Sequence, residues 1–177
     1  MTCAGALPIV EPGGKKWEKM GLETHEAMFR GANKLTLDIK GRMVMPTRYR
    51  ERLQERCGGK LVITVDKDQC LLVYPMPDWE EIERKLMKLP TFNERARRLQ
   101  RLMVGYATEL DLDAQGRVLL PPNLREFASL TRDAVLIGQG LRFELWDEEK
   151  WNQRRDEWLA SEESATGPSD DLGSLSL

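Results

Sequence analysis

Short apolar runs separated by turn residues recur along most of this chain, and they predict strands more than long helices. Met43–Met45 and Val118–Leu120 are runs of three apolar residues. Such runs are long enough for a buried strand and too short for a helix. Longer apolar runs occur in pairs around a polar or glycine-containing turn, which predicts two β-hairpins. The hairpin pairs are Lys60–Val65 with Leu71–Tyr74, and Ala134–Ile137 with Leu141–Trp146.

The short runs belong to a unit that occurs twice. Leu37–Pro46 reads LDIKGRMVMP, and 75 positions later Leu112–Pro121 reads LDAQGRVLLP. The pair Arg50-Glu51 recurs at the same offset as Arg125-Glu126. Repetition at a fixed offset indicates two copies of one structural unit. Each copy therefore predicts a strand, a turn, a second strand, a short helix and a hairpin.

The motif D-x-x-G-R in each copy predicts a tight turn. Asp38 and Asp113 can accept hydrogen bonds from backbone amides two or three residues further on. Gly41 and Gly116 supply the position with φ > 0. We expect these residues to form the turn, and we favour this role for the two aspartates over acid–base catalysis. The arginine after each glycine lies where the chain leaves the turn, so its side chain is expected at an edge.

A proline ends each short strand, which suits the start of a following helix. Helices are expected over Thr47–Arg56 and Asn123–Ala128, and Gly58-Gly59 ends the first. Between the copies, Asp78–Val104 predicts two helices broken at Leu89-Pro90, with Asp78 or Thr91 as a cap. Their apolar stripes favour a packing or subunit-contact element over a ligand site. The stripes are Ile82, Leu86 and Leu89, and Leu99, Leu102 and Met103.

These elements divide the chain into five segments. Repeats of this length can hardly bury a core alone, so the two halves are expected to pack on one another. The ends differ in composition, with Gly and Pro near the start and Ser, Asp and Gly near the end. The segments are a disordered extension (1–27), the first repeat (32–78), a helical linker (79–104), the second repeat (107–150) and a flexible tail (160–177).

The net charge of −2 conceals an asymmetry between the halves. Residues 28–104 hold 17 Lys and Arg against 10 Asp and Glu, a net charge of +7, whereas residues 105–177 have a net charge of −8. Such asymmetry suggests that nucleic acid meets one part of the molecule. The alternative is that the charged helical segment 80–101 inflates the first number.

The sequence lacks the residues that common catalytic sites need. His25 is the only histidine, and it lies in the extension. No phosphate-binding or nucleophile motif occurs, and Cys3, Cys57 and Cys70 form no metal-binding or disulfide pattern. We therefore expect no enzyme activity, no cofactor and no metal. No apolar stretch approaches a membrane span and no signal peptide is evident, which favours a cytoplasmic protein.

Two interpretations of Arg42 and Arg117 remain open from composition alone. Each arginine could pair with the nearby aspartate and brace its own turn. Alternatively, its guanidinium could be presented to phosphates or to guanine O6 and N7 in the major groove of DNA.

Several motifs in order resemble the MraZ family of bacterial transcription regulators, from Met28 to about Trp158. The motifs are Met28–Gly31, both D-x-x-G-R turns, Pro46–Arg50 and Phe143–Asp147. The resemblance implies an α+β, β-rich fold in which two SpoVT-AbrB-type repeats form one pseudo-two-fold, swapped-hairpin β-barrel with a helical linker. It also implies a nucleoid-associated repressor that binds tandem direct repeats of double-stranded DNA as a ring-shaped homo-oligomer. The implied target is the promoter of the division and cell-wall gene cluster.

The resemblance places the arginine of the first D-x-x-G-R repeat on the DNA-binding face. The first copy is expected to be the better DNA reader, because basic residues surround Arg42 whereas Arg117 has acidic and neutral neighbours. The predicted DNA-binding residues are Arg42, Lys40, Arg30, Lys34, Arg48 and Arg117. The alternatives are a structural ring-forming protein and an AbrB-like antitoxin that acts through a protein partner.

Overall fold

The computed structural model describes residues 28–164 of the chain, and side chains as far as Ser161. The expected disordered extension, 1–27, lies outside the described residues, as does most of the expected tail. The last helix, α5 (Glu148–Ser164), continues past residue 160. The first residues of the expected flexible tail are therefore helical, which corrects the boundary at 160.

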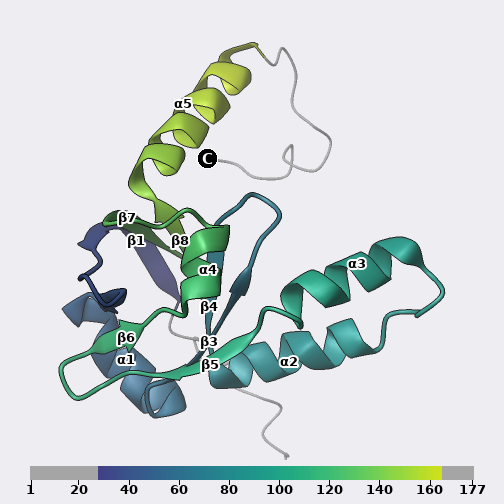
Figure 1. Cartoon of the computed structure of the whole chain (residues 1–177), viewed down its shortest axis with the longest axis horizontal. Coiled ribbons are helices and arrows are strands. Elements are labelled where there is room, and N and C mark those ends of the chain that lie inside the picture. Colours follow the sequence, from purple (N-terminus) through teal and green to yellow (C-terminus); the bar gives the residue numbers. More distant parts are fainter. Residues whose placement is uncertain (1–27, 165–177) are drawn as a thin grey trace, which may run out of the picture.

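Within residues 28–164, six strands form one antiparallel sheet, and two short strands form a separate antiparallel ribbon (Figure 1). The order in the sheet is β1-β7-β8-β4-β3-β5. The strands are β1 (Phe29–Thr36), β3 (Lys60–Val65), β4 (Leu71–Pro75), β5 (Thr108–Asp111), β7 (Asp133–Gly140) and β8 (Arg142–Asp147). The ribbon consists of β2 (Arg42–Val44) and β6 (Arg117–Leu119).

Strands of the two repeats pair with one another across the sheet. β1 of the first repeat pairs with β7 of the second, and β5 of the second pairs with β3 of the first. The ribbon likewise takes one strand from each repeat. Each repeat thus completes the sheet of the other, which explains how units too short to bury a core alone can fold. The predicted α+β class is confirmed, whereas the closed, swapped-hairpin barrel stays a prediction.

Two short helices follow the ribbon strands, as the prolines predicted. Pro46 and Pro121 occupy the N-cap positions of α1 (Thr47–Cys57) and α4 (Pro122–Phe127). α1 ends at Gly58, which adopts φ 60° and donates its N–H to the Gln54 carbonyl.

The helices α2 (Met76–Met87) and α3 (Glu94–Met103) form an arm that projects from the body (Figure 1). The predicted caps are wrong. Asn93 caps α3, because its side chain accepts the N–H groups of Arg95 and Ala96. Asp78 instead lies inside the first turn of α2, where its carboxylate is bonded to the Arg56 guanidinium at 2.5 and 2.9 Å. Nothing in the local sequence reveals that partner, because it comes from α1.

Apolar residues of the arm divide between its inner and outer sides. Leu86 belongs to an apolar cluster beneath the arm, and Ile82, Leu89 and Met103 pack against that cluster. The two remaining residues of the second predicted stripe, Leu99 and Leu102, are exposed. The arm therefore buries one apolar side and leaves another open.

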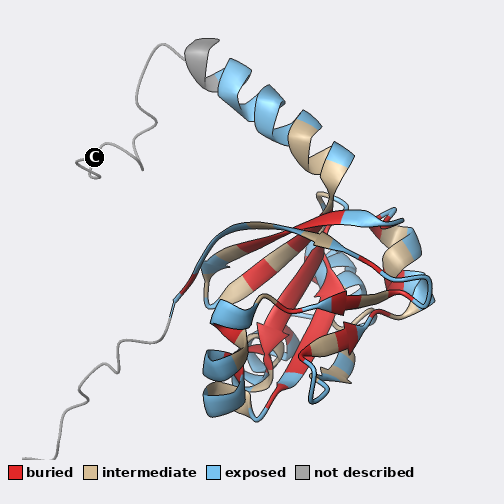
Figure 2. Ribbon diagram, turned by 90° about the vertical axis from the view of Figure 1, so that its left-hand side faces the viewer, coloured by how far each residue is buried: buried red, intermediate tan, exposed pale blue. Residues whose placement is uncertain are grey.

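The main core lies between the six-stranded sheet and a layer formed by the ribbon, α1 and α4. Met43 and Val118 from the ribbon are fully buried in it beside Tyr49, Leu124 and Phe143. A second cluster covers the opposite face of the sheet, under α2 and α5. Its largest members are Tyr74, Trp79 and Trp146. Figure 2 shows buried residues running through the sheet while the outer surface of the covering segments stays exposed. The core thus fixes the ribbon from below.

Candidate nucleic-acid interface

The ribbon presents one face to the core and one to solvent. Successive side chains of a strand point to opposite faces. The central pair, Met43 and Val118, points inward. The four remaining side chains therefore form the outer face. They are Arg42 opposite Leu119, and Val44 opposite Arg117. The two arginines lie on a diagonal of this face, and each is contributed by a different repeat.

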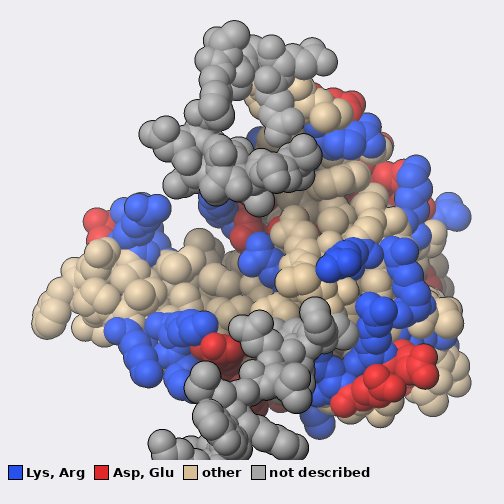
Figure 3. All heavy atoms as spheres, turned by 180° about the vertical axis from the view of Figure 1, so that it is seen from behind, with Lys and Arg blue, Asp and Glu red and all other residues tan. Residues whose placement is uncertain are grey.

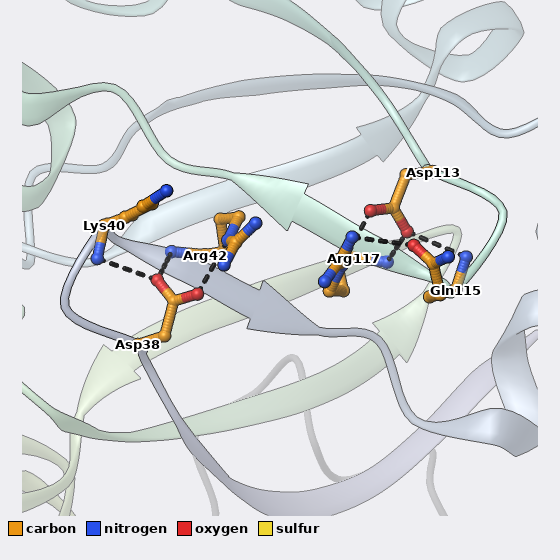
Figure 4. Close-up of polar contacts among 6 residues, drawn as sticks. All are labelled: Asp38, Lys40, Arg42, Asp113, Gln115 and Arg117. Carbon is orange, nitrogen blue, oxygen red and sulfur yellow. Dashed lines mark hydrogen bonds and ion pairs between the residues drawn. The ribbon is translucent and has the colours of Figure 1, made fainter.

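Hydrogen bonds accepted by an aspartate carboxylate hold each turn (Figure 4). Asp38 Oδ1 accepts the backbone N–H groups of Lys40 and Arg42, both at 2.9 Å. Asp113 Oδ1 accepts those of Gln115 and Arg117 at 2.9 and 2.8 Å. The bond from the arginine backbone N–H is the main reason that the pKa of each aspartate is lowered, although desolvation opposes the shift. Both carboxylates are therefore ionised acceptors at neutral pH.

The same carboxylates orient the arginine side chains. Asp38 Oδ2 accepts Arg42 Nε at 2.6 Å, and Asp113 Oδ2 accepts Arg117 Nε at 2.7 Å. In Arg117 the terminal Nη2 also donates to Gln115 Oε1 at 2.7 Å. In Arg42 neither terminal nitrogen has a protein partner among the described residues. Bracing of the turn uses Nε, whereas presentation to DNA would use the two terminal nitrogens, so the two roles are compatible. The terminal nitrogens of Arg42 are more available than those of Arg117.

The two turns are also locked to one another through their glycines. Gly41 and Gly116 adopt φ values of 79° and 74°. The Gly41 carbonyl accepts the Leu120 N–H at 3.0 Å, and the Gly116 carbonyl accepts the Met45 N–H at 2.8 Å. Each glycine carbonyl therefore bonds to the other repeat, just beyond that repeat's ribbon strand.

An arginine from the opposite repeat packs against each glycine. Arg125 of α4 lies over Gly41, and Arg50 of α1 lies over Gly116, so closely that a Cβ on either glycine would collide with the arginine. Arg50 Nε donates to the Met45 carbonyl at 2.7 Å, and Arg125 Nε donates to the Leu120 carbonyl at 3.2 Å. Neither arginine was predicted as a site residue. Their recurrence at the repeat offset was the signal that could have identified them.

Comparison with known proteins agrees with this duplicated geometry. A family model described as "MraZ protein, putative antitoxin-like" matches the chain twice, over residues 28–102 and 103–173. The chain belongs to the MraZ family. Both matches contain one D-x-x-G-R turn, so the family pattern coincides with the internal repeat.

Several relatives named transcriptional regulator MraZ align with this chain over the whole length of the relative. The protein of Thioalkalivibrio sulfidiphilus is 60% identical over 150 residues, which cover 85% of this chain and 100% of the relative. The protein of Methylococcus capsulatus is 55% identical over 152 residues, and that of Pseudomonas aeruginosa is 52% identical over 151, with the same coverage. The MraZ family is named for transcription regulation and not for an enzyme activity.

Only some of the predicted DNA-binding residues lie at the β2/β6 ribbon. Lys40 lies in the first turn, between Asp38 and Arg42, and its side chain is exposed (Figure 4). Arg30 and Lys34 of β1 point to the opposite sheet face, because Phe29 and Leu35 of the same strand pack into the main core. Lys34 Nζ pairs there with Glu148 of α5. Arg30 and Lys34 are therefore close to Arg42 in sequence but do not share its surface.

Arg48 is likewise not part of the ribbon surface. Its Nη2 donates to the Tyr49 hydroxyl at 2.6 Å, and its guanidinium lies 4.7 Å from the centre of the Tyr49 ring. The Tyr49 hydroxyl in turn donates to the Arg30 carbonyl at 2.6 Å. Arg48 thus supports the contact between α1 and β1. Of the predicted DNA-binding residues, Arg42, Lys40 and Arg117 are the three that lie in the ribbon or its first turn.

Within residues 28–164 no group of His, Cys, Asp and Glu has the arrangement of a metal site. The same residues contain no helix that is long and apolar enough to span a membrane. Burial raises the pKa of the Cys57 and Cys70 thiols. Neither cysteine is therefore prepared as a nucleophile or metal ligand.

Replacing Gly41 with alanine is expected to destabilise the fold more than the same change at Gly58. Both glycines have positive φ, but a Cβ at Gly58 meets no atom within 4 Å. Gly58→Ala should therefore lower the free energy of unfolding by about 1 kcal/mol. Gly41→Ala should cost roughly 2–3 kcal/mol because it must also displace Arg125. Urea denaturation measures both losses. Adding Arg125→Ala to Gly41→Ala should reduce the extra loss of stability at Gly41. Equal losses for Gly41→Ala and Gly58→Ala would contradict the proposed clash.

Proposed function

We propose that this chain is a sequence-specific DNA-binding transcription regulator that reads DNA with the outer face of the β2/β6 ribbon. The names of its relatives supply the regulatory role. The observation that carries the proposal is the diagonal arrangement of Arg42 and Arg117, each held by an aspartate and directed away from the core.

A two-stranded ribbon with arginines on its outer face supports the proposed base recognition. The major groove of B-DNA admits a two-stranded β-ribbon, and arginine binds guanine O6 and N7 through two parallel hydrogen bonds. A guanidinium already fixed at Nε loses less conformational freedom on binding than a mobile one. We assign a phosphate contact to Lys40, which is exposed at the tip of the first turn. Such a contact adds affinity without sequence preference.

The proposal extends to assembly and target. Since strands of both repeats complete one sheet within a chain, contacts between chains are free to be head-to-tail and to close into a ring. Exposed Met87, Phe92, Leu99 and Leu102 on the arm support a subunit contact there. Following the family resemblance, we include the pseudo-two-fold barrel and the repression of the division and cell-wall cluster from tandem direct repeats. Cytoplasmic location at the nucleoid belongs to the same proposal.

Basic residues are not confined to the ribbon. Figure 3, seen from behind, shows Lys and Arg side chains on the body and on the arm, with Asp and Glu among them. On this face a basic side chain therefore does not by itself mark a DNA-binding surface.

A second function is favoured by the description of the family model as antitoxin-like. An antitoxin acting through a protein partner, or a purely structural ring, would not need sequence-specific DNA. A mobility-shift assay separates these functions, with the full-length protein, duplexes carrying tandem short repeats from the DNA beside its gene, and scrambled competitor. The proposed regulator binds the repeats preferentially. Equal binding to scrambled DNA would reject the regulator.

Neutralising Lys40 is expected to change the salt dependence of DNA binding. If Lys40 contacts one phosphate, Lys40→Gln should flatten the plot of log affinity against log salt by about 0.9. Lys34→Gln is the matched control, because Lys34 is exposed and basic but pairs with Glu148 on the opposite sheet face. Anisotropy titrations at several salt concentrations measure the slopes. An unchanged slope for Lys40→Gln would place this side chain away from DNA.

A further inference from the structure

Two apolar side chains on the outer face of the ribbon have no role in the core. Val44 is 46% exposed and Leu119 is 54% exposed. The inward residues, Met43 and Val118, already anchor the ribbon and are completely buried. The outer face therefore consists of two arginines and two apolar residues in alternating corners.

This arrangement restricts what can cover the face. A surface built only for phosphates would gain from charged or hydrogen-bonding groups at all four corners. Instead, Val44 stands directly opposite Arg117, and Leu119 stands directly opposite Arg42. Any ligand that pairs with the arginines therefore brings its neighbouring groups onto Val44 and Leu119. Those neighbouring groups must be apolar to gain from the contact.

In the major groove, the apolar group on a base edge is the C5-methyl of thymine. Diagonal neighbours in an antiparallel pair lie about 7–8 Å apart, which corresponds to about two base steps of 3.4 Å. Val44 and Leu119 can thus reach bases in the same short stretch that the arginines read.

We propose that Val44 and Leu119 are specificity-determining residues that bind thymine methyl groups beside the guanines contacted by Arg42 and Arg117. The inference rests on the proposed DNA-binding function and adds a second base to it. Each ribbon then reads a mixed sequence of guanine and thymine, with one apolar contact supplied by each repeat.

The test compares thymine with deoxyuridine, which differs only by lacking the methyl group. The probe is a duplex recovered from a randomised library by repeated selection on the full-length protein. Uracil then replaces thymine one position at a time, and affinity is measured by anisotropy at fixed salt. Each contacted methyl should contribute roughly a four-fold change in affinity. The variant Val44→Ala/Leu119→Ala should bind the thymine duplex more weakly and show the same affinity for both duplexes.

Leu159→Ala is the control, because Leu159 is 57% exposed on α5 and lies in neither the ribbon nor the arm. It should keep the parent's preference for thymine. Circular dichroism checks that each variant is folded, and the mass of the oligomer is measured in parallel. A parent protein indifferent to uracil would overturn the inference and leave the proposed function standing. A double variant that keeps the preference for thymine would also overturn it. The same holds for a double variant whose weaker binding is explained by a changed oligomer mass alone. Recovery of no preferred sequence would reject the function itself.

Discussion

Arg42→Ala is expected to remove most sequence-specific DNA binding and leave the fold intact. The Arg42 side chain is about one-third exposed, and its side-chain contact among the described residues is the pair with Asp38. An exposed pair of this kind contributes little to stability. Loss of a bidentate contact to guanine costs about 1–3 kcal/mol for each subunit, or roughly 5- to 150-fold in affinity. A ring that engages several repeats multiplies this loss through avidity.

Two further variants locate the cause of the Arg42 effect. Arg117→Ala should weaken binding less, because Arg117 Nη2 is already held by Gln115. Arg42→Lys keeps the charge but loses the planar fork, so it should restore non-specific affinity without restoring preference for the operator. Titrations at matched salt compare the variants with the parent. If Arg42→Ala binds operator as tightly as the parent, the ribbon is not the reading surface.

Inverting one repeat of a tandem operator is expected to weaken binding nearly as much as deleting that repeat. Subunits related by rotation in a ring present their ribbons in the same sense. The matching DNA pattern is a series of direct repeats, whereas a two-fold dimer would match a palindrome. A spacing of about 10 bp would place successive repeats on one face of the duplex.

Footprinting on paired duplexes measures the effect of inversion. One duplex carries an inverted repeat, and its control carries a scrambled repeat of the same length and base composition. Protection should be lost over the altered repeat in both. Full protection of the inverted repeat would contradict a ring that reads direct repeats.

The sequence predicted most elements of the fold to within a few residues. Its strong signals were short apolar runs bounded by Asp-x-x-Gly turns and by prolines, and these signals are local. Pro46 and Pro121 accordingly mark the starts of α1 and α4. The pairing of β1 with β7 was beyond local reading, because it joins residues about a hundred positions apart.

The candidate site was only partly predictable for the same reason. The duplicated turn predicted that Arg42 and Arg117 lie where the chain leaves each turn, and both side chains are about one-third exposed there. Lys34 was grouped with them by sequence distance, although strand alternation directs it to the other face of the sheet. Asp78 resembled a helix cap, yet its side chain is buried against Arg56 from another helix. The roles of Arg50 and Arg125 depend on packing between the two repeats, which the local sequence does not show.

The most direct test of the central claim is a double-mutant cycle between Arg42 and the guanine it is proposed to contact. Replacing that guanine by 7-deazaguanine removes the N7 acceptor and keeps base pairing. The parent protein should lose affinity for the modified duplex, whereas Arg42→Ala should bind both duplexes equally because the contact is already gone. If the modification weakens the parent and Arg42→Ala by the same factor at every guanine of the operator, Arg42 does not read that base and the proposed interface is wrong.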